Sequence, residues 1–534
     1  MIPSGPPKPA ASGQIRTADV LGALSLAADL ATGLTEEHAI RSCYIGMHIA
    51  DRLQLASEER TALFYAELLM DAGCTAWTSQ LAAAILGDEI VARREWVFFT
   101  NPNNPIEVLN WLRTYVAADA PVPARSRQAL KFALHGKDST REGFRNTCES
   151  ARRFAQRLGM PEDVQAALFS VFEQWDGKGP HGTVGESIPI VSRIVYVTSF
   201  LEAFSSIGGR SATTLLAEKK RGNAFDPVVV DAFLSLAEDE VFWDGLEQES
   251  AWTSVSGLEP PSPYQFLRED QLEDVALAFA DFADLKTFYT AGHSRRTADL
   301  AESMARQLRL PHDDVSTIRR AAMMHDIGLV TVPSFVLQKP NAKLTTVEWE
   351  GLRLHPYQGE RILARVPAFE PVLPLVAAHH ERMDGQGYYR GLSGSQIPLG
   401  ARVIAVADQF DTLTHETPDH PALPLEDTLN RIQSEMSRGF WPDAVEALGQ
   451  VVQGGGHGRR MEKVKVREWP AGLTDREVEI VRLLTRGLSR REMAAQLFLS
   501  EHTVRHHLEH IYNKIGVSTR VAATLFAVEQ GLLD

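Results

Sequence analysis

The chain has 534 residues, a length typical of roughly three to four domains of about 150 residues each. Its composition, 44% hydrophobic and 23% charged, is that of a globular protein and excludes a wholly disordered, collagen-like or coiled-coil chain. The net charge of −15 argues against a chain coated with nucleic acid, so any DNA contact must come from a local patch.

The N-terminal segment lacks the apolar stretch of a signal peptide, which predicts a flexible tail over residues 1–19. No apolar run approaches the roughly 18 residues that span a bilayer, so no membrane association is predicted. The three cysteines, Cys43, Cys74 and Cys148, lie far apart and outside any metal-ligand spacing. This sparse, odd set is typical of a reducing cytoplasm.

Two further breaks interrupt the chain. Three prolines within 258–263 forbid a continuous helix. The glycines at 454–456 precede a basic segment, which indicates either a hinge with a basic arm or a solvated linker. The basic residues of this segment are Arg459, Arg460, Lys463, Lys465 and Arg467. The predicted divisions are 1–19, 20–257, 264–453, 454–467 and 468–534.

An internal repeat crosses the first of these breaks. His38 precedes Asp71 by 33 residues, and His293 precedes Asp326 by 33 residues, within similar surrounding sequences. Three later motifs recur in the same order, the clearest being Trp-Asp-Gly-Lys-Gly at 175–179 and Met-Asp-Gly-Gln-Gly at 383–387. Apolar residues three and four apart, as in 294–308, indicate buried helical faces. The sequence therefore predicts an all-α protein containing two copies of one helical domain, the first with an insertion of roughly 47 residues.

The second copy contains a set of candidate metal ligands. They are His293, His325, Asp326, His355, His379, His380 and Asp408. Imidazole combined with carboxylate suits Fe, Mn, Ni, Co or Zn better than Mg or Ca. Two such ions about 3.5–4 Å apart can clamp a phosphodiester and generate hydroxide near neutral pH.

These residues lie in motifs that resemble the HD-GYP branch of the HD-domain phosphohydrolases, over about 270–450. The motifs are His-Ser-Arg-Arg at 293, His-Asp-Ile-Gly at 325, His-Pro-Tyr-Gln-Gly-Glu at 355, His-His-Glu-Arg-Met-Asp-Gly-Gln-Gly-Tyr-Tyr at 379 and Val-Ala-Asp-Gln-Phe-Asp at 406. The resemblance implies a helical domain with two or three transition-metal ions that cleaves cyclic dinucleotides, chiefly cyclic di-GMP. It also implies that the seven candidates are the ligands, that Asp326 bridges the ions, and that His325 and Asp326 form the catalytic pair.

The second copy departs from the family at several positions. Leu329 replaces a phosphate-binding lysine, and Tyr389 replaces the proline of the Gly-Tyr-Pro motif. Tyr289 stands where members with three metals have a glutamate, and the sequence at 417–420 replaces a cationic segment. We therefore expect two ions, with cyclic di-GMP hydrolysed weakly or another phosphodiester preferred.

The first copy has lost most of the ligands. His38 and Asp71 remain, whereas Met70, Thr147, Val171, Phe172 and Ser199 replace the others. Two ligands cannot hold a binuclear centre, so this copy is predicted to bind no metal. A sensory, docking or dimerisation role is left open.

The last 67 residues are predicted to form about four short helices. Capping boxes begin at Thr474 and Ser489, and Gly487 and Gly516 lie where helices should stop. A helix after Ser500 completes a helix-turn-helix pattern, although a protein-docking helical domain is the alternative.

This segment resembles the LuxR-type DNA-binding domain, from Leu-Thr-Asp-Arg-Glu at 473 to Lys-Ile-Gly-Val at 514. The resemblance implies a homodimer on an inverted-repeat site in double-stranded DNA. The residues it places near DNA are Thr503, Val504, Arg505, His507 and Lys514.

The leading interpretation is a cytoplasmic transcription regulator coupled to a metal-dependent domain that binds or cleaves a cyclic dinucleotide. One alternative is a non-catalytic sensor of metal and nucleotide, and another is a phosphodiesterase that its DNA-binding domain merely localises. The sequence leaves open the nucleotide, the metal, the operator and the direction of regulation.

Overall fold

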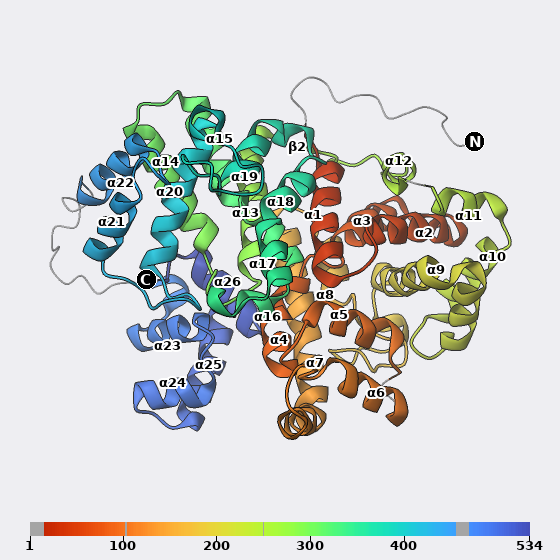
Figure 1. The fold of residues 1–534 in the computed structure, drawn as a ribbon. Helices are drawn as coiled ribbons and strands as arrows, with labels where there is room; N and C mark the ends of the chain where they lie inside the picture. The colour runs from red at the N-terminus through yellow and green to blue at the C-terminus, as the bar shows by residue number, and fades with distance from the viewer. Residues whose placement is uncertain (1–14, 102–103, 249, 455–468, 534) are drawn as a thin grey trace. The chain divides into compact units, whose positions relative to one another are not determined.

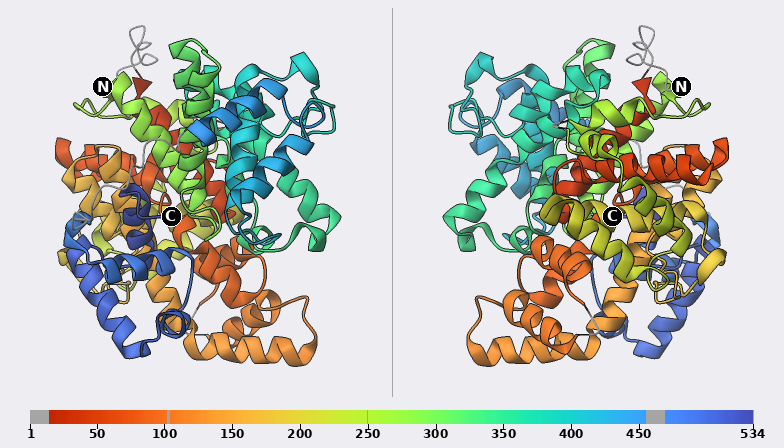
Figure 2. Two further views of the ribbon diagram at one scale, coloured as in Figure 1. Left: turned by 90° about the vertical axis from the view of Figure 1, so that its left-hand side faces the viewer. Right: turned by 90° about the vertical axis from the view of Figure 1, so that its right-hand side faces the viewer.

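The computed structural model describes residues 15–101, 104–248, 250–454 and 469–533. Its regular structure is almost entirely helical, and the sheet within these ranges is one antiparallel pair, β1 (Ile15–Arg16) with β2 (Phe266–Leu267) (Figures 1 and 2). The predicted all-α class is therefore confirmed. Residues 455–467 of the predicted linker, with its basic arm, lie outside the described residues, as do residues 1–14.

The chain divides into two compact units, one of residues 1–278 with 365–367 and the other of residues 279–364 with 368–534. The division falls within α13, later than the proline-rich break at 258–263, which is nonetheless free of helix. The predicted tail also ends earlier than expected, because α1 begins at Thr17.

The helices of the first unit are α1 (Thr17–Thr32), α2 (His38–Leu53), α3 (Ser57–Leu69), α4 (Thr78–Ile85), α5 (Glu89–Arg94), α6 (Pro105–Tyr115), α7 (Val122–Arg157), α8 (Glu162–Phe169), α9 (Ile190–Lys220), α10 (Pro227–Leu236), α11 (Glu240–Leu246) and α12 (Ala251–Ser256). By length and hydropathy α9 alone among the described helices could cross a membrane, and 61% of its most apolar window is buried within the protein. That burial is typical of a core helix.

The division splits α13 (Leu272–Asp284). After it, the helical domain of the second unit contains α14 (His293–Gln307), α15 (His312–Met324), α16 (Ser334–Leu337), α17 (Thr346–Arg353), α18 (His355–Leu363), α19 (Leu373–Ala378), α20 (Leu399–Thr414), α21 (Leu425–Ser434) and α22 (Pro442–Gly454). The C-terminal domain contains α23 (Asp475–Thr485), α24 (Arg490–Leu497), α25 (Glu501–Ile515) and α26 (Arg520–Glu529).

The two units repeat the same local structure. Helix α2 begins at His38 and α14 begins at His293, and in each case the following residue's backbone N–H donates to a buried aspartate nine residues before the histidine. These aspartates are Asp29 and Asp284. Matching carboxylates thus anchor the start of matching helices, as the internal repeat predicts.

A close backbone approach is also repeated. A Cβ atom on Gly73 would lie 1.9 Å from the carbonyl oxygen of Thr147, and one on Gly328 would lie 1.9 Å from that of His355. Only glycine allows the chain to pass so near the neighbouring helix. The turn after Met70-Asp71 in the first copy and the turn after His325-Asp326 in the second copy therefore each pack against the helix that contains the next ligand position of the repeat.

The insertion in the first copy forms a small structural region of its own. Helices α4 to α6 and part of α7 enclose a separate apolar cluster that includes Trp77, Ile85 and Trp111. Its independent packing explains how the repeat accommodates the extra residues.

The C-terminal domain has its own core, built from all four of its helices. Both predicted capping boxes are present, with Thr474 and Ser489 accepting the expected backbone N–H groups. Gly487 and Gly516 have positive φ angles, as predicted for helix stops. The final helix is capped by Thr519 and ends at Glu529.

Candidate metal centre and DNA-binding face

Most of the candidate ligands of the second copy lie at or near helix ends. His293 and His355 are the first residues of α14 and α18, and His325 directly follows α15. His379 directly follows α19, whereas Asp408 lies within α20. These helices come from distant parts of the sequence, and the fold brings their ends together. Motif spacing gives only the order of the ligands along the chain, whereas the fold places them at one site.

Two groups of ligands share one carboxylate. Oδ2 of Asp326 lies 3.6 Å from Nε2 of His293 and 3.4 Å from Nε2 of His325. Its Oδ1 lies 3.4 Å from Nε2 of His355 and 3.7 Å from Nε2 of His379. Each oxygen of Asp326 therefore faces a different pair of imidazoles, which is the arrangement expected of a carboxylate that bridges two ions.

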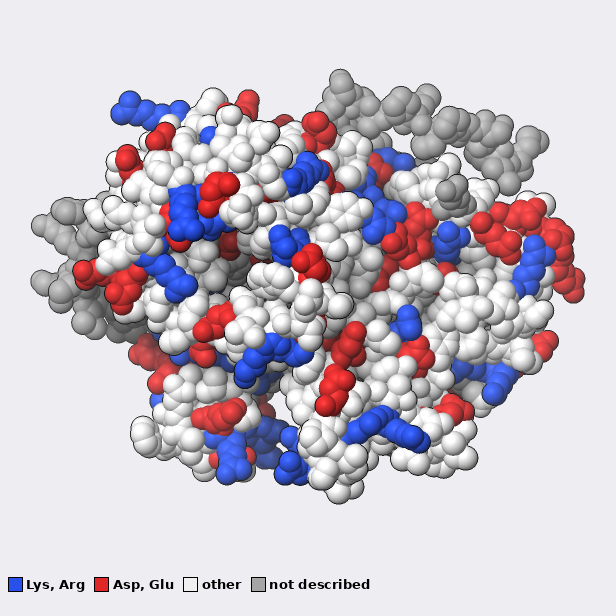
Figure 3. Space-filling view, in the orientation of Figure 1, with Lys and Arg blue, Asp and Glu red and all other residues white. Residues whose placement is uncertain are grey.

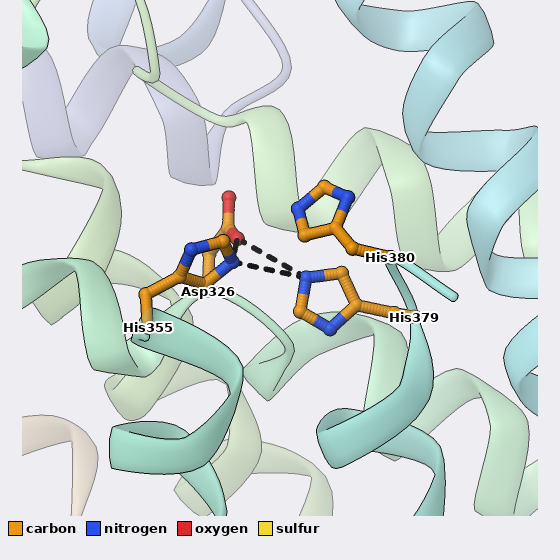
Figure 4. Close-up of side chains that lie close together, drawn as sticks. All are labelled: Asp326, His355, His379 and His380. Atoms are coloured by element: carbon orange, nitrogen blue, oxygen red, sulfur yellow. Dashed lines mark hydrogen bonds and ion pairs between the residues drawn. The ribbon is translucent and has the colours of Figure 1, made fainter. Parts of the chain in front are cut away.

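The remaining ligands complete the two groups. His380 joins Asp326, His355 and His379, whose potential ligand atoms all lie within 4.8 Å of one another (Figure 4). Oδ1 of Asp408 lies 3.2 Å from Nε2 of His293. All seven predicted ligands thus gather at one place.

Backbone carbonyls orient three of the imidazoles. Nδ1 of His325, His355 and His379 each lies 2.7 Å from the carbonyl oxygen of the residue three positions earlier. Nδ1–H donation to a carbonyl leaves Nε2 as the free lone pair that a metal requires. The buried Nε2 of His325 has no hydrogen-bond partner among the described residues, so the donor set fits a metal ion.

Asp411 orients the remaining buried imidazole. Its Oδ2 lies 2.7 Å from Nδ1 of His293, and Arg296 donates to both of its oxygens at 2.7 and 2.9 Å. Asp411 and Arg296 lie within the quoted motifs, but the sequence analysis assigned no role to either residue. Asp411 lies one helical turn after Asp408, and that spacing was the available indication.

The electrostatics keep two of the imidazoles neutral and the central carboxylate ionised. Burial, followed by the neighbouring His355, lowers the pKa of His380 to about 4. Burial and adjacent imidazoles likewise lower the pKa of His379 well below its usual value. Burial alone would raise the pKa of Asp326. The surrounding imidazoles, first that of His325, have the larger effect and lower this pKa well below its usual value. Neutral imidazoles beside an ionised carboxylate are what a divalent ion binds.

His293 differs from these two imidazoles. Burial alone would lower its pKa, but the carboxylates of Asp408 and Asp411 raise it well above its usual value. This imidazole must therefore lose a proton to bind an ion.

Tyr388 borders the centre. Its ring lies 4.8 Å from that of His380, and the guanidinium carbon of Arg353 lies 5.3 Å from the Tyr388 ring centroid. Burial, with the charges of Asp408 and Asp326, raises the pKa of the phenol, so it remains a hydrogen-bond donor. Tyr388 and Arg353 are candidate substrate contacts that the motif analysis did not identify.

The substituted positions do not supply the missing cations. Leu329 is half-buried and apolar. Residues 417–420 form a turn in which Asp419 accepts a hydrogen bond from the backbone N–H of Asn341 at 2.7 Å. Tyr289 is 37% exposed, and Tyr389 donates to Glu360 at 2.6 Å.

The equivalent place in the first copy is filled by its own side chains. Nδ1 of His38 contacts the Glu202 carboxylate, and its Nε2 lies 3.2 Å from the Ser199 hydroxyl. Both ring nitrogens therefore have protein partners. Asp71 accepts a hydrogen bond from the Cys74 thiol at 2.9 Å. Among the described residues of this copy, no group of three possible ligands comes together.

The predicted DNA-binding residues divide between the outside and the inside of α25. Arg505 is exposed and lies 3.4 Å from Glu509, and His507 is half-buried. The Thr503 hydroxyl lies 2.8 Å from that of Ser500. Figure 3 shows basic side chains near α24 and α25 on a face where both signs of charge otherwise mix.

Two of these predictions require adjustment. Val504 is fully buried in the core of the C-terminal domain, so it is not available for DNA contact. Its side chain packs α25 against the rest of that core. Lys514 donates to Glu477 at 2.7 Å and to the carbonyl of Gly472 at 3.0 Å. Lys514 must therefore leave or share this ion pair to reach a phosphate.

Comparison with known proteins defines the class. Residues 278–443 match the HD domain family, and residues 471–527 match the family of bacterial regulatory proteins of the luxR type. The chain is 31% identical over 431 residues to 3′3′-cGAMP-specific phosphodiesterase 3 of Vibrio cholerae, covering 80% of this chain and 93% of that protein. The crystal structure of a V. cholerae cyclic GMP-AMP specific phosphodiesterase (V-cGAP3) superposes with a TM-score of 0.56 at 29% identity, covering 83% of this chain and 98% of that one.

A cyclic di-GMP phosphodiesterase of Thermotoga maritima is 35% identical over 184 residues, which are 34% of this chain and 49% of that protein. The chain therefore belongs to the HD-GYP-type family of HD-domain cyclic dinucleotide phosphodiesterases. It also contains a LuxR-type helix-turn-helix domain.

Proposed function

We propose that the second copy is a metal-dependent phosphodiesterase that cleaves a cyclic dinucleotide, and that residues 468–534 bind DNA and regulate transcription. The sharing of Asp326 between two groups of imidazoles supports the enzymatic role. The ligands would be His293, His325, Asp326, His355, His379, His380 and Asp408, holding two ions of Fe, Mn, Ni, Co or Zn.

The bound ions would supply Lewis acidity and a hydroxide near neutral pH. The residues of the chain position these groups. Asp326 turns one oxygen toward each pair of imidazoles and would hold an ion on each side. Hydrogen bonds from Nδ1 to backbone carbonyls fix the Nε2 atoms of His325, His355 and His379. Tyr388 is placed to donate a hydrogen bond to a substrate phosphate, and Arg353 adds positive charge beside it.

We propose that cyclic GMP-AMP is preferred to cyclic di-GMP. The relative that matches over most of its length is named as specific for 3′3′-cGAMP, and the lysine position of the cyclic di-GMP-cleaving family is Leu329 here. A lost charge-assisted hydrogen bond to phosphate costs about 1.5–3 kcal/mol. Cyclic di-GMP turnover should therefore be weak.

The test is kcat/KM for both dinucleotides with manganese-loaded protein. Leu329→Lys should raise cyclic di-GMP turnover roughly tenfold or more, as one restored contact implies. Strong cyclic di-GMP turnover that this lysine leaves unchanged would refute the proposed preference. Asp326→Ala is the control for contaminating hydrolases.

The DNA-binding role depends on the exposed side of α25. Arg505→Ala should reduce discrimination between DNA sites by about 1–3 kcal/mol. Arg505→Lys keeps the charge but loses bidentate recognition of a guanine, so it separates base reading from phosphate attraction. Genome-wide footprinting with and without the dinucleotides provides the measurement, and the absence of any enriched site would contradict the proposal.

The cellular arrangement is part of the same proposal. We place the protein in the cytoplasm as a homodimer on an inverted repeat, consistent with a LuxR-type domain and three buried free cysteines. Two alternatives remain: a sensor without turnover, and an enzyme that its DNA-binding domain localises. Loss of hydrolysis in His325→Ala with regulation retained favours the localised enzyme, whereas loss of the ligand response favours the sensor.

A further inference from the structure

The outward side of α25 carries two histidines one helical turn apart. Nε2 of His502 lies 3.1 Å from Nε2 of His506, and the ring planes are nearly perpendicular with centroids 4.5 Å apart. Both residues are exposed. Side chains at i and i+4 lie on the same face of a helix, so the backbone places the two imidazoles beside each other.

The separation of these nitrogens matches the requirement of a shared ion. Zinc binds imidazole nitrogen at about 2.0–2.1 Å, so ligand angles of about 90–109° place two nitrogens about 2.9–3.4 Å apart. The 3.1 Å between His502 and His506 falls within this range. Imidazole pairs suit Zn, Cu and Ni, which also accept water at their remaining positions.

The surroundings of His506 favour this use of Nε2. Its Nδ1 lies 3.6 Å from a carboxylate oxygen of Glu509, whose other oxygen lies 3.4 Å from Arg505. A carboxylate beside Nδ1 favours the tautomer whose Nε2 lone pair is free to bind a metal. His510 is also exposed and follows one turn later along the same helix.

We propose that His502 and His506 bind a divalent zinc-class ion, separate from the centre in the second copy, and that this ion lowers the DNA sequence selectivity of α25. The binding site depends only on this pair. The effect on DNA rests on the proposed DNA-binding function. An ion that occupies both Nε2 atoms removes them from hydrogen bonding to bases, and its water shell takes up space in the major groove.

The first experiment measures zinc per full-length chain by equilibrium dialysis and elemental analysis. Wild type should hold one more ion than His502→Gln/His506→Gln. His312→Gln, which removes another exposed histidine, is the matched control and should match wild type. The extra ion should persist in His325→Ala/Asp326→Ala, so failure of the other metal centre cannot be mistaken for failure here. Equal zinc in wild type and the double glutamine variant would overturn the proposed site.

The second experiment measures the ratio of affinities for a site selected from a random DNA library and for unrelated DNA, with and without zinc. Zinc should lower this ratio about tenfold in wild type and leave it unchanged in His502→Gln/His506→Gln. Each protein serves as its own reference, so any direct loss of DNA contact in the variant does not affect the comparison. An equal response of both proteins to zinc would overturn the regulatory part.

Discussion

The two helical copies share a fold but differ in the partners of the first histidine of the repeat. In the second copy, His293 points one nitrogen at Asp411 and the other at Asp408 and Asp326. In the first copy, His38 points one nitrogen at Glu202 and the other at a serine. In the second copy, the carboxylate of Asp411 orients a candidate metal ligand. In the first copy, the carboxylate of Glu202 instead forms an ion pair with His38. Retaining a histidine and an aspartate does not retain a metal site, because the ligand atoms must also be left without protein partners.

The largest expected difference between the copies follows from removing the central aspartate. Asp326→Ala should abolish binding of both ions and reduce hydrolysis by about a thousandfold or more, since bound metals supply several kcal/mol of transition-state stabilisation. Asp71→Ala, at the equivalent position, should leave metal content and activity unchanged. Elemental analysis and turnover of cyclic GMP-AMP provide the readouts. Loss of metal in Asp71→Ala would show that the first copy contributes a site.

The orienting carboxylates offer the next test. Asp411→Asn should weaken metal binding about 10–100-fold, because a partner of a ligating histidine fixes its ring orientation and basicity. Glu202→Gln should not affect metal binding, but it should destabilise the first copy by leaving His38 in a buried site without a full counter-charge. Metal titration and thermal unfolding distinguish these effects. Identical metal affinity in wild type and Asp411→Asn would contradict the positioning role.

The paired glycines test what the copies have in common. Gly73→Ala and Gly328→Ala should each destabilise their own unit by about 1–3 kcal/mol, because the new Cβ would overlap a backbone carbonyl oxygen. Gly351, with open space around its Cβ position, is the control for substitution as such. Local hydrogen exchange in each unit reports the change. A large effect in one copy and none in the other would show that the close backbone contact is not equally required in the two copies.

The last prediction concerns pH and is specific to the first copy. Burial alone would lower the pKa of His38, but Glu202 and then Asp29 and Asp71 outweigh it and raise this pKa to about 9. Burial raises the pKa of Glu67 to about 8. The stabilisation from charged His38 is complete below its ordinary pKa of 6.5 and is lost as pH rises through about 9. Glu67 acts in the same direction, because its unfolded form releases a proton at lower pH.

The unfolding free energy of the first copy should therefore fall between pH 6.5 and 9, by roughly 1 kcal/mol per pH unit for each proton involved. Exchange of α2 amides, corrected for intrinsic rates, is the measurement. His38→Leu/Glu202→Leu should reduce the slope. A rise in protection across this range would show that the sign is wrong.

Much of this architecture was accessible from the sequence. Helical periodicity gave the all-α class, and the order of motifs gave the repeat. Val504, Leu508, Ile511 and Ile515 recur at the spacing of one helical face, and all four are buried. These features are predictable because they depend on spacings of a few residues or on motifs that fold in the same local way wherever they occur.

The sequence by itself determined which residues of the second copy could ligate a metal and where the capped helices of the C-terminal domain begin. Only the tertiary structure decided that Asp326 gives one oxygen to each ligand group, that Asp411 orients His293, and that Tyr388 borders the centre. These relationships join helices far apart in the chain, and their distances depend on how the helices pack. Local periodicity contains no information about that packing, so the partners of each nitrogen and oxygen appear only in the folded protein.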